Sequence, residues 1–255
     1  MVAFKGRSSL KQYIPLKPTK RGFKVWTLCD SANGYISNFQ VYTGAQGSSP
    51  EYGLGGQVVK TLAQPFLDKN YNLFFDNYFS SVELLSSLSS HNTYCVATTQ
   101  TKRKQWPKDL NVKELKDTMS RGKCHSVIVQ TSNGTDVQCL LWMDKKCVPF
   151  VNTLTDPSSS ATVVRKNKDG TRVDVDCPMA VKLYNKFMGG VDLADQRHKT
   201  YTTSRKSIKW WMPIFHYLVD ISLVNGYILY KDNNPNQTKK LTQKEFHLEV
   251  AKELL

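Results

Sequence analysis

The sequence has little of what marks several common classes of protein. Its six cysteines are scattered and form no Cys-x-x-Cys pair, so neither a zinc site nor a redox motif is visible. A chain of 255 residues does not need a disulfide framework, and we expect reduced, mostly buried thiols in a nuclear or cytosolic protein. No apolar stretch follows the first four residues, which argues against a signal peptide, and no internal repeat or long polar tract is found.

Acidic residues are also in short supply. The 21 Asp and Glu residues face 35 Lys and Arg, which gives a net charge of +14 and a pI near 9.4. A basic surface gains affinity for a phosphate backbone by releasing counterions, so a polyanion is the first partner to consider. Charge alone does not select it, because ribosomal and secreted proteins are basic for other reasons.

One apolar run, residues 211–230, raises the question of a membrane span. Asp220 near its middle would cost about 3 kcal/mol on an insertion scale, and Pro213, His216 and Asn225 add to that cost. We therefore predict a buried core helix and no membrane contact.

The first part of the chain shows strand and helix patterns in alternation. Residues 22–44 alternate in strand fashion around the turn-like segment Asp30–Gly34, which predicts a β-hairpin. Residues 55–68 have helical spacing of apolar residues, closed by Lys69 and Asn70.

The next elements predict a mixed α/β fold. Residues 73–76 form a short apolar run typical of a buried central strand that ends in a carboxylate. Ser80 with Glu83 predicts a capping box for the following helix, and residues 93–98 predict another strand.

Residues 100–177 are more polar, with β-rich pieces at 126–130 and 137–142, and we interpret them as an insertion. From Pro178 onward the pattern is helical, with helices expected over 180–187, after Gly189-Gly190, after Trp210 and from Thr242 to the end.

Three carboxylates are candidates for a divalent metal. Asp76 follows a buried strand, where open α/β sheets place ligands, although such a residue is often a turn or cap. Asp192 and Asp195 share a face if the segment after Gly190 is helical, although acidic residues in a first helical turn are ordinary. Mg²⁺ takes carboxylate oxygens and completes its shell with water and substrate phosphate.

Four segments resemble the piggyBac transposase family, including its domesticated descendants. They occur in the family's order and span nearly the whole chain: Phe4–Trp26, Phe75–Ser81 (FDNYFSS), Tyr184–Gln196 (YNKFMGGVDLADQ) and Arg205–Trp211 (RKSIKWW).

The resemblance implies an RNase H-like core with a β-rich insertion and a helical C-terminal part, in an α/β fold. The core would comprise residues 1–99 and 178–255, and the insertion residues 100–177. It also implies a DDE active site that cuts and joins DNA with Mg²⁺ or Mn²⁺. Residue by residue, Asp76 matches the second catalytic aspartate, Asp192 the third and Asp195 an additional acidic position, so the expected metal ligands are Asp76 and Asp192.

The sequence departs from the family at the first catalytic aspartate. That residue lies just before the Phe-x-Gly-Arg motif, where Met1 occupies the methionine of the family's segment, and Asp30 in a turn is a poor substitute. Thr98-Thr99 also replaces the family's usual Gly-Thr. No counterpart is found for the family's N-terminal DNA-binding and dimerisation region or its C-terminal cysteine-rich zinc module. We expect these 255 residues to be catalytically incomplete, the alternatives being an active transposase with a mis-assigned start and a non-enzymatic DNA- or chromatin-binding protein.

Clusters of basic residues provide candidates for DNA contact, although most charge runs are solvated faces. One lies near the N-terminus, at Lys17, Lys20, Arg21 and Lys24. The other two supply the predicted DNA-binding residues: Lys102, Arg103 and Lys104, then Arg197, Lys199, Arg205, Lys206 and Lys209.

The third basic cluster begins just beyond Asp192 and is the best candidate for holding phosphates. We expect Trp106 to be a candidate for base stacking, and Trp210 and Trp211 to anchor the last long helix in the core. The predicted partner is DNA, with a homodimer as a further expectation, no small-molecule substrate and a nuclear location.

Overall fold

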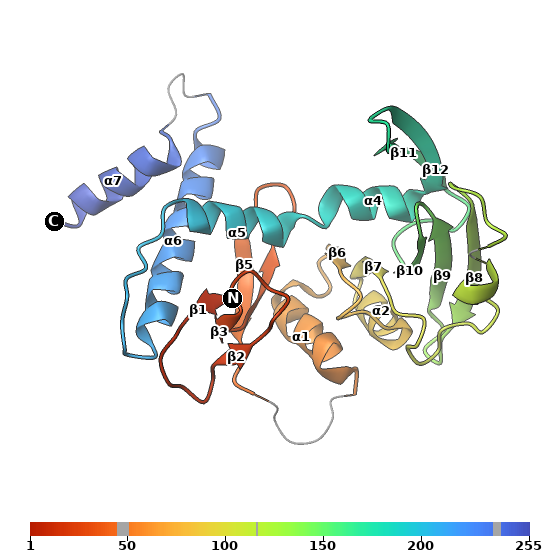
Figure 1. Cartoon of the computed structure of the whole chain (residues 1–255), viewed down its shortest axis with the longest axis horizontal. Helices are drawn as coiled ribbons and strands as arrows, with labels where there is room; N and C mark the ends of the chain where they lie inside the picture. The colour runs from red at the N-terminus through yellow and green to blue at the C-terminus, as the bar shows by residue number, and fades with distance from the viewer. Residues whose placement is uncertain (45–50, 116, 237–240) are drawn as a thin grey trace. The chain divides into compact units, whose positions relative to one another are not determined.

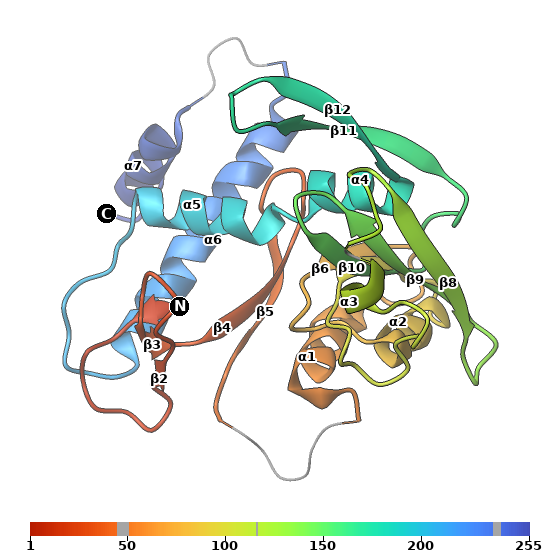
Figure 2. The same ribbon diagram turned by 45° about the vertical axis from the view of Figure 1, so that its right-hand side comes forward.

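The structure is a computed structural model that describes residues 1–44, 51–115, 117–236 and 241–255. Contacts divide the chain into two compact units. Unit 1 combines residues 1–47 with 189–255, and unit 2 comprises residues 48–188. Figures 1 and 2 show the elements of both units by label.

The strands of unit 1 confirm the predicted hairpin. β4 (Val25–Cys29) pairs antiparallel with β5 (Ile36–Val41), and the turn between them carries Gly34 at φ 75°. A small antiparallel sheet precedes it, in the order β1-β3-β2, made of β1 (Val2–Ala3), β2 (Gln12–Tyr13) and β3 (Arg21–Phe23).

Three helices complete unit 1, as the sequence predicts: α5 (Gly190–Thr200), α6 (Met212–Asn233) and α7 (Gln243–Glu253). In both views of unit 1, α5 lies across α6 (Figures 1 and 2). Ile36 of β5, Ala194 of α5, and Tyr217 and Ile221 of α6 form one buried cluster. The hairpin and two helices are therefore joined by a shared core.

Helix α6 is long and apolar enough to cross a membrane by length and composition, with 39% of its most apolar window buried. One such helix is weak evidence, because core helices of soluble proteins meet the same criteria. Two of its polar side chains are used inside the protein: Asp220 accepts hydrogen bonds from Thr202 and Thr203, and the Asn225 amide bonds both backbone groups of Ile36. These contacts favour the predicted core helix.

The main sheet of unit 2 has five strands in the order β6-β7-β10-β9-β8. β6 and β7 are parallel and the other neighbours antiparallel. Its strands are β6 (Asn72–Phe75), β7 (Tyr94–Thr98), β8 (Cys124–Gln130), β9 (Asp136–Met143) and β10 (Cys147–Asn152).

The prediction of a central strand at residues 73–76 is wrong for this sheet, because β6 lies at its edge. Only Leu73 of the apolar run is buried, and Phe74 and Phe75 are half-buried. The run correctly identified a strand, but strand order depends on pairing with distant segments. β8, β9 and β10 continue the same sheet, while β11 (Ser160–Lys166) and β12 (Arg172–Pro178) form a separate hairpin.

Four α-helices are described in unit 2: α1 (Gly53–Ala63), α2 (Val82–Ser89), α3 (Val112–Leu115) and α4 (Met179–Phe187). The helix predicted over residues 55–68 ends earlier, at Ala63, followed by a 3₁₀ turn over Gln64–Phe66.

The predicted capping box at Ser80 and Glu83 is wrong by one residue. Ser81 has the extended backbone of an N-cap, and its hydroxyl accepts from the Leu84 N–H at 3.1 Å. Glu83 is instead bound by Lys104 at 3.3 Å and Gln105 at 3.2 Å.

Helix α4 closes the core of unit 2. Its buried residues Ala180, Val181 and Tyr184 pack with Val96, Leu140, Trp142 and Phe150 of the sheet and with Val175 and Cys177 of β12. The mixed α/β fold is thus confirmed, and the predicted boundaries at 99/100 and 177/178 stay a prediction.

Candidate nucleic-acid interface

Asp76 lies directly after β6 and is exposed. One of its carboxylate oxygens accepts the Tyr78 N–H at 2.8 Å, and its carbonyl accepts the Phe79 N–H at 3.2 Å. The second carboxylate oxygen accepts no hydrogen bond from the described residues. Asp76 is therefore a turn residue that keeps one oxygen available to a cation.

Arg103 holds the turn that follows Asp76. Its guanidinium donates to the carbonyl oxygens of Asn77 at 3.1 Å and Tyr78 at 2.8 Å. Gly55 allows α1 to approach this turn closely, since a Cβ there would overlap the Tyr78 carbonyl oxygen. Sequence reasoning found Arg103 only as a candidate phosphate contact and missed this second contact.

The second basic cluster is thus partly engaged within unit 2. Arg103 binds the turn and Lys104 lies 3.3 Å from Glu83, while Lys102 is exposed. Trp106, a candidate for base stacking, is half-buried and donates its indole N–H to the Leu110 carbonyl at 3.0 Å.

The other two candidate carboxylates lie on α5, which confirms the predicted helix after Gly190. Asp192 is exposed in its first turn, where a carboxylate is favoured by the helix dipole. Asp195 is half-buried and pairs with Lys199, four residues on, at 3.0 Å. Asp192 forms no ion pair within the described residues and is the freer of the two.

The turn at residues 30–34 packs tightly on α5. A Cβ on Gly34 would lie 2.9 Å from the Ala194 amide nitrogen, and one on Gly190 would lie 3.0 Å from the Asp30 carbonyl oxygen. The Asp30 carboxylate accepts the Ala32 N–H of its own turn at 2.7 Å, so it serves the turn as expected. This contact fixes the helix that carries Asp192, and sequence reasoning missed it.

Burial is the largest cause of the pKa shifts of Cys29 and Tyr217, two groups that also interact with Asp195 of α5. It raises the pKa of the Cys29 thiol to about 11, against an opposing hydrogen bond from Thr27 and with a smaller contribution from Asp195. It also raises the pKa of Tyr217, again with a contribution from Asp195. The six cysteines are free thiols, but the expected burial holds for only three of them: Cys95, Cys139 and Cys177 are buried, and the others are half-buried.

The described residues contain no group of three or more His, Cys, Asp or Glu side chains that could hold a metal ion. Asp76 and Asp192 nevertheless fit Mg²⁺ in ligand type, because each is an exposed carboxylate and this ion needs only one or two of them besides water and phosphate. Asp76 belongs to unit 2 and Asp192 to unit 1.

Residues 197–211, which we call the basic segment, comprise the last turn of α5 and the loop that leads to α6. The cations Arg205, Lys206 and Lys209 are exposed and form no ion pair with the described residues, whereas Lys199 is paired and Arg197 is half-buried. Free cations on a surface loop are available to an external anion.

The prediction that Trp210 and Trp211 anchor the long helix in the core is wrong. They are 47% and 46% exposed, beside Ile208 at 93%. The reason is that α6 begins only at Met212, with Pro213 in its first turn, so both tryptophans precede the helix. A proline in the first turn was a signal for this boundary. The Lys209 ammonium lies 5.9 Å from the Trp211 ring centre, which places aromatic and basic groups together.

His198 and His247 should make unit 1 less stable in acid. Burial lowers the pKa of both rings, against an opposing attraction from Asp220. The unfolded chain, with histidine pKa values near about 6.5, then binds more protons than the folded one. We expect the free energy of unfolding to stay constant above that pH and to decrease as the pH drops through it.

Denaturant titrations between about pH 7 and pH 5 measure this loss. His198→Gln should flatten the pH dependence, whereas His125→Gln, on the exposed surface of β8, should leave it unchanged. Equal slopes for His198→Gln and the parent protein would contradict the assignment.

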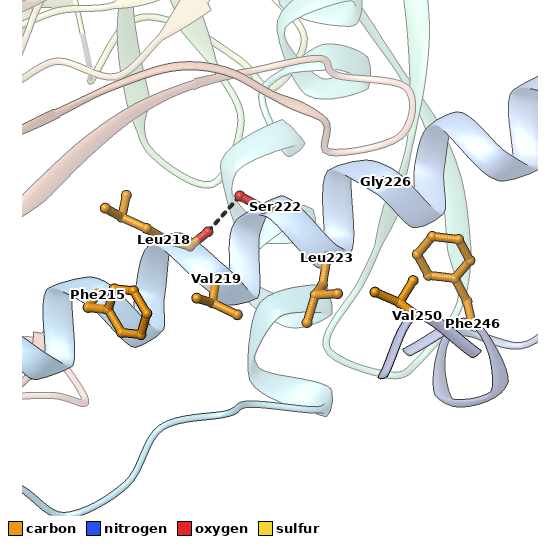
Figure 3. Close-up of a pocket in the computed structure, with 8 residues that line it drawn as sticks. All are labelled: Phe215, Leu218, Val219, Ser222, Leu223, Gly226, Phe246 and Val250. Carbon is orange, nitrogen blue, oxygen red and sulfur yellow. Dashed lines mark hydrogen bonds between the residues drawn. The ribbon is translucent and has the colours of Figure 1, made fainter. Parts of the chain in front are cut away.

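An open groove of about 460 Å³ runs along α6 and α7 (Figure 3). Its lining is apolar except for Ser222, whose hydroxyl donates to the Leu218 carbonyl at 2.8 Å, and includes Phe215, Phe246 and Val250. It contains none of the predicted site residues and offers nothing to bind a phosphate.

Comparison with known proteins identifies the relatives of this chain. A family model described as Transposase IS4, of the DDE transposases, matches residues 1–227. The human PiggyBac transposable element-derived protein 3 is 29% identical over 238 residues, which cover 91% of this chain and 39% of the human protein. The human PiggyBac transposable element-derived protein 2 is 27% identical with the same coverage. The chain therefore spans less than half the length of these relatives.

A solved structure gives the same answer for the fold. The piggyBac transposase in a synaptic complex with hairpin DNA superposes with a TM-score of 0.81 at 26% identity, over 98% of this chain and 49% of that one. The mixed α/β fold is thus that of the transposase. Together, the family match, the relatives and the shared fold show that the chain belongs to the piggyBac transposase family.

Proposed function

We propose that this chain binds DNA through the phosphate backbone, with the basic segment as its main contact. The observation that carries the proposal is the exposure of Arg205, Lys206 and Lys209, without acidic partners among the described residues, directly after the helix that bears Asp192 and Asp195. The similar solved transposase is a complex with hairpin DNA, which supports DNA as the polyanion.

The chemistry of this segment suits backbone contact rather than base reading. Each cation that neutralises a phosphate releases counterions, a gain that is independent of sequence. Trp210 and Trp211 present exposed rings on which an unpaired base can stack, a contact worth about 1–3 kcal/mol per base. We therefore expect binding with little sequence preference and strong dependence on salt.

The finer assignments from the family belong to the same proposal. The core is RNase H-like, Asp76 and Asp192 are the second and third aspartates of a DDE site, and Asp195 is an additional acidic residue. Both aspartates would hold Mg²⁺ or Mn²⁺, which when bound activates an attacking water and neutralises the leaving oxygen of a phosphodiester. DNA strand cleavage is a separate activity that the binding proposal does not require, and the nuclear location and homodimer stay predictions.

Lys206→Glu tests the binding proposal. Loss of one phosphate contact should lower the affinity for a fluorescein-labelled DNA hairpin by roughly tenfold at about 0.1 M salt and reduce the slope of log K against log salt by about 0.9. Fluorescence anisotropy over a series of salt concentrations measures both quantities.

Lys168→Glu is the matched control, because Lys168 is an exposed loop lysine between β11 and β12, outside every predicted cluster. It makes the same change in net charge. If the two variants lose affinity equally, the effect is one of overall charge and the basic segment is not the interface.

A further inference from the structure

Asp220 is a buried charge at the middle of an apolar helix, with 1% of its surface exposed. A buried carboxylate is costly unless it is paired or hydrogen-bonded. Its partners come from the chain before α6: the Thr202 hydroxyl donates to one oxygen at 2.6 Å, and the Thr203 N–H donates to the other at 2.7 Å. The buried carboxylate of α6 thus binds two residues of the basic segment.

The contact extends toward the cations of the basic segment. The Thr202 hydroxyl, while donating to Asp220, also accepts the Ser204 N–H at 3.1 Å, and Ser204 immediately precedes Arg205. His198 closes the other side, with its ring nitrogen 4.0 Å from the same carboxylate oxygen that Thr202 binds. Asp220 therefore holds Thr202 and Thr203 directly, and it holds Ser204 through the Thr202 hydroxyl.

The cations themselves lie in chain without regular structure. Residues 202–207 belong to no helix or strand, and Arg205 and Lys206 are exposed there. Ordering a free residue costs backbone entropy, so a loop already held in its bound shape binds more tightly. A loop with one anchored end presents its charges at defined positions.

We propose that Asp220, acting through Thr202 and Thr203, is a positioning residue that pre-orders the basic segment for DNA phosphates. This inference rests on the proposed DNA binding and adds the buried group that makes the segment an organised binding surface.

Thr202→Val tests the inference without opening a cavity, since Thr202 is exposed and valine has nearly its shape. It removes the hydroxyl that bridges Asp220 and Ser204. We expect the affinity for the labelled DNA hairpin to fall on the order of fivefold, the usual net effect of losing one intramolecular hydrogen bond. Thr202→Ser keeps the hydroxyl and should restore most of the affinity.

A double-mutant cycle separates positioning from general stability. If Thr202 acts through the cations of the segment, Thr202→Val should weaken binding less in a Lys206→Glu background than in the parent chain. Thr171→Val is the matched control, because the Thr171 hydroxyl also donates to an aspartate, Asp169, at 2.7 Å, in unit 2. It should leave DNA affinity unchanged.

The outcomes distinguish this inference from the proposed function. No binding by the parent chain would defeat the proposed function itself. If Lys206→Glu weakens binding while Thr202→Val matches the parent, DNA binding stands and the positioning role is overturned. Asp220→Asn gives a second measure, because it loses the acceptor for the Thr202 hydroxyl or for the Thr203 N–H, and parent-like affinity in that folded variant would also overturn the role.

Discussion

Replacing Gly34 with alanine is expected to lower the free energy of unfolding by about 2–5 kcal/mol. A side chain at its φ of 75° costs about 1–2 kcal/mol in the left-handed region. The new Cβ would also lie 2.9 Å from the Ala194 amide nitrogen on α5, and crowding of this kind adds about 1–3 kcal/mol. Chemical denaturation followed by circular dichroism measures the change.

Gly134 provides the control for Gly34. It has a similar φ of 80° in the turn between β8 and β9, but a Cβ added there would meet no atom of another residue within 4 Å among the described parts of the chain. Gly134→Ala should therefore cost only the backbone part, about 1–2 kcal/mol. Equal losses for the two variants would show that the turn does not press on α5 in the way the structure describes.

Replacing Trp142 with alanine is expected to lower the free energy of unfolding by about 3–5 kcal/mol, the range for large aromatic residues in a core. Trp142 is 2% exposed in the main core of unit 2. Its indole N–H donates to the Asp176 carbonyl at 2.9 Å, and the Arg165 guanidinium lies 5.4 Å from its ring centre. The substitution removes packing, a hydrogen bond and a cation–π contact together.

Trp142→Phe separates these contributions. Phenylalanine keeps most of the ring volume but leaves the Asp176 carbonyl without its donor, which costs about 1–3 kcal/mol. The alanine variant should therefore be clearly less stable than the phenylalanine variant in the same denaturation experiment. If both lose the same amount, packing of the ring contributes little and the described core is wrong at this position.

Local chemistry explains which elements the sequence predicted. The turn residues of Asp30–Gly34 produce the hairpin of β4 and β5, and the glycine pair at 189–190 marks the start of α5, as expected. These predictions succeeded because each depends on residues that are neighbours in the chain.

Distant contacts explain what the sequence left out. Strand β6 was recognised, but its place at the sheet edge depends on which segments pair with it. The contact of Arg103 with the turn after Asp76 joins residues 25 and 26 positions apart. Asp220 was noticed only as an obstacle to a membrane span, because its partners Thr202 and Thr203 lie in a segment with no periodic pattern.

For the candidate site too, the sequence located the residues and the structure added their contacts. The family motifs located Asp76, Asp192 and Asp195, and the spacing of the last two correctly indicated one helix. Only the structure shows that Lys199 forms an ion pair with Asp195, while Asp192 remains exposed. It also shows the exposed tryptophans beside Lys209, which strengthen the case for nucleic acid over a simple solvated face.

Hydrogen–deuterium exchange of the chain with and without a DNA hairpin tests the central claim most directly, because it locates the contact. DNA binding through the basic segment predicts slower exchange of backbone amides in residues 197–211, lost as salt is raised. Unchanged exchange across residues 197–211 at a DNA concentration that saturates binding would contradict the account, and protection elsewhere would show where the interface lies.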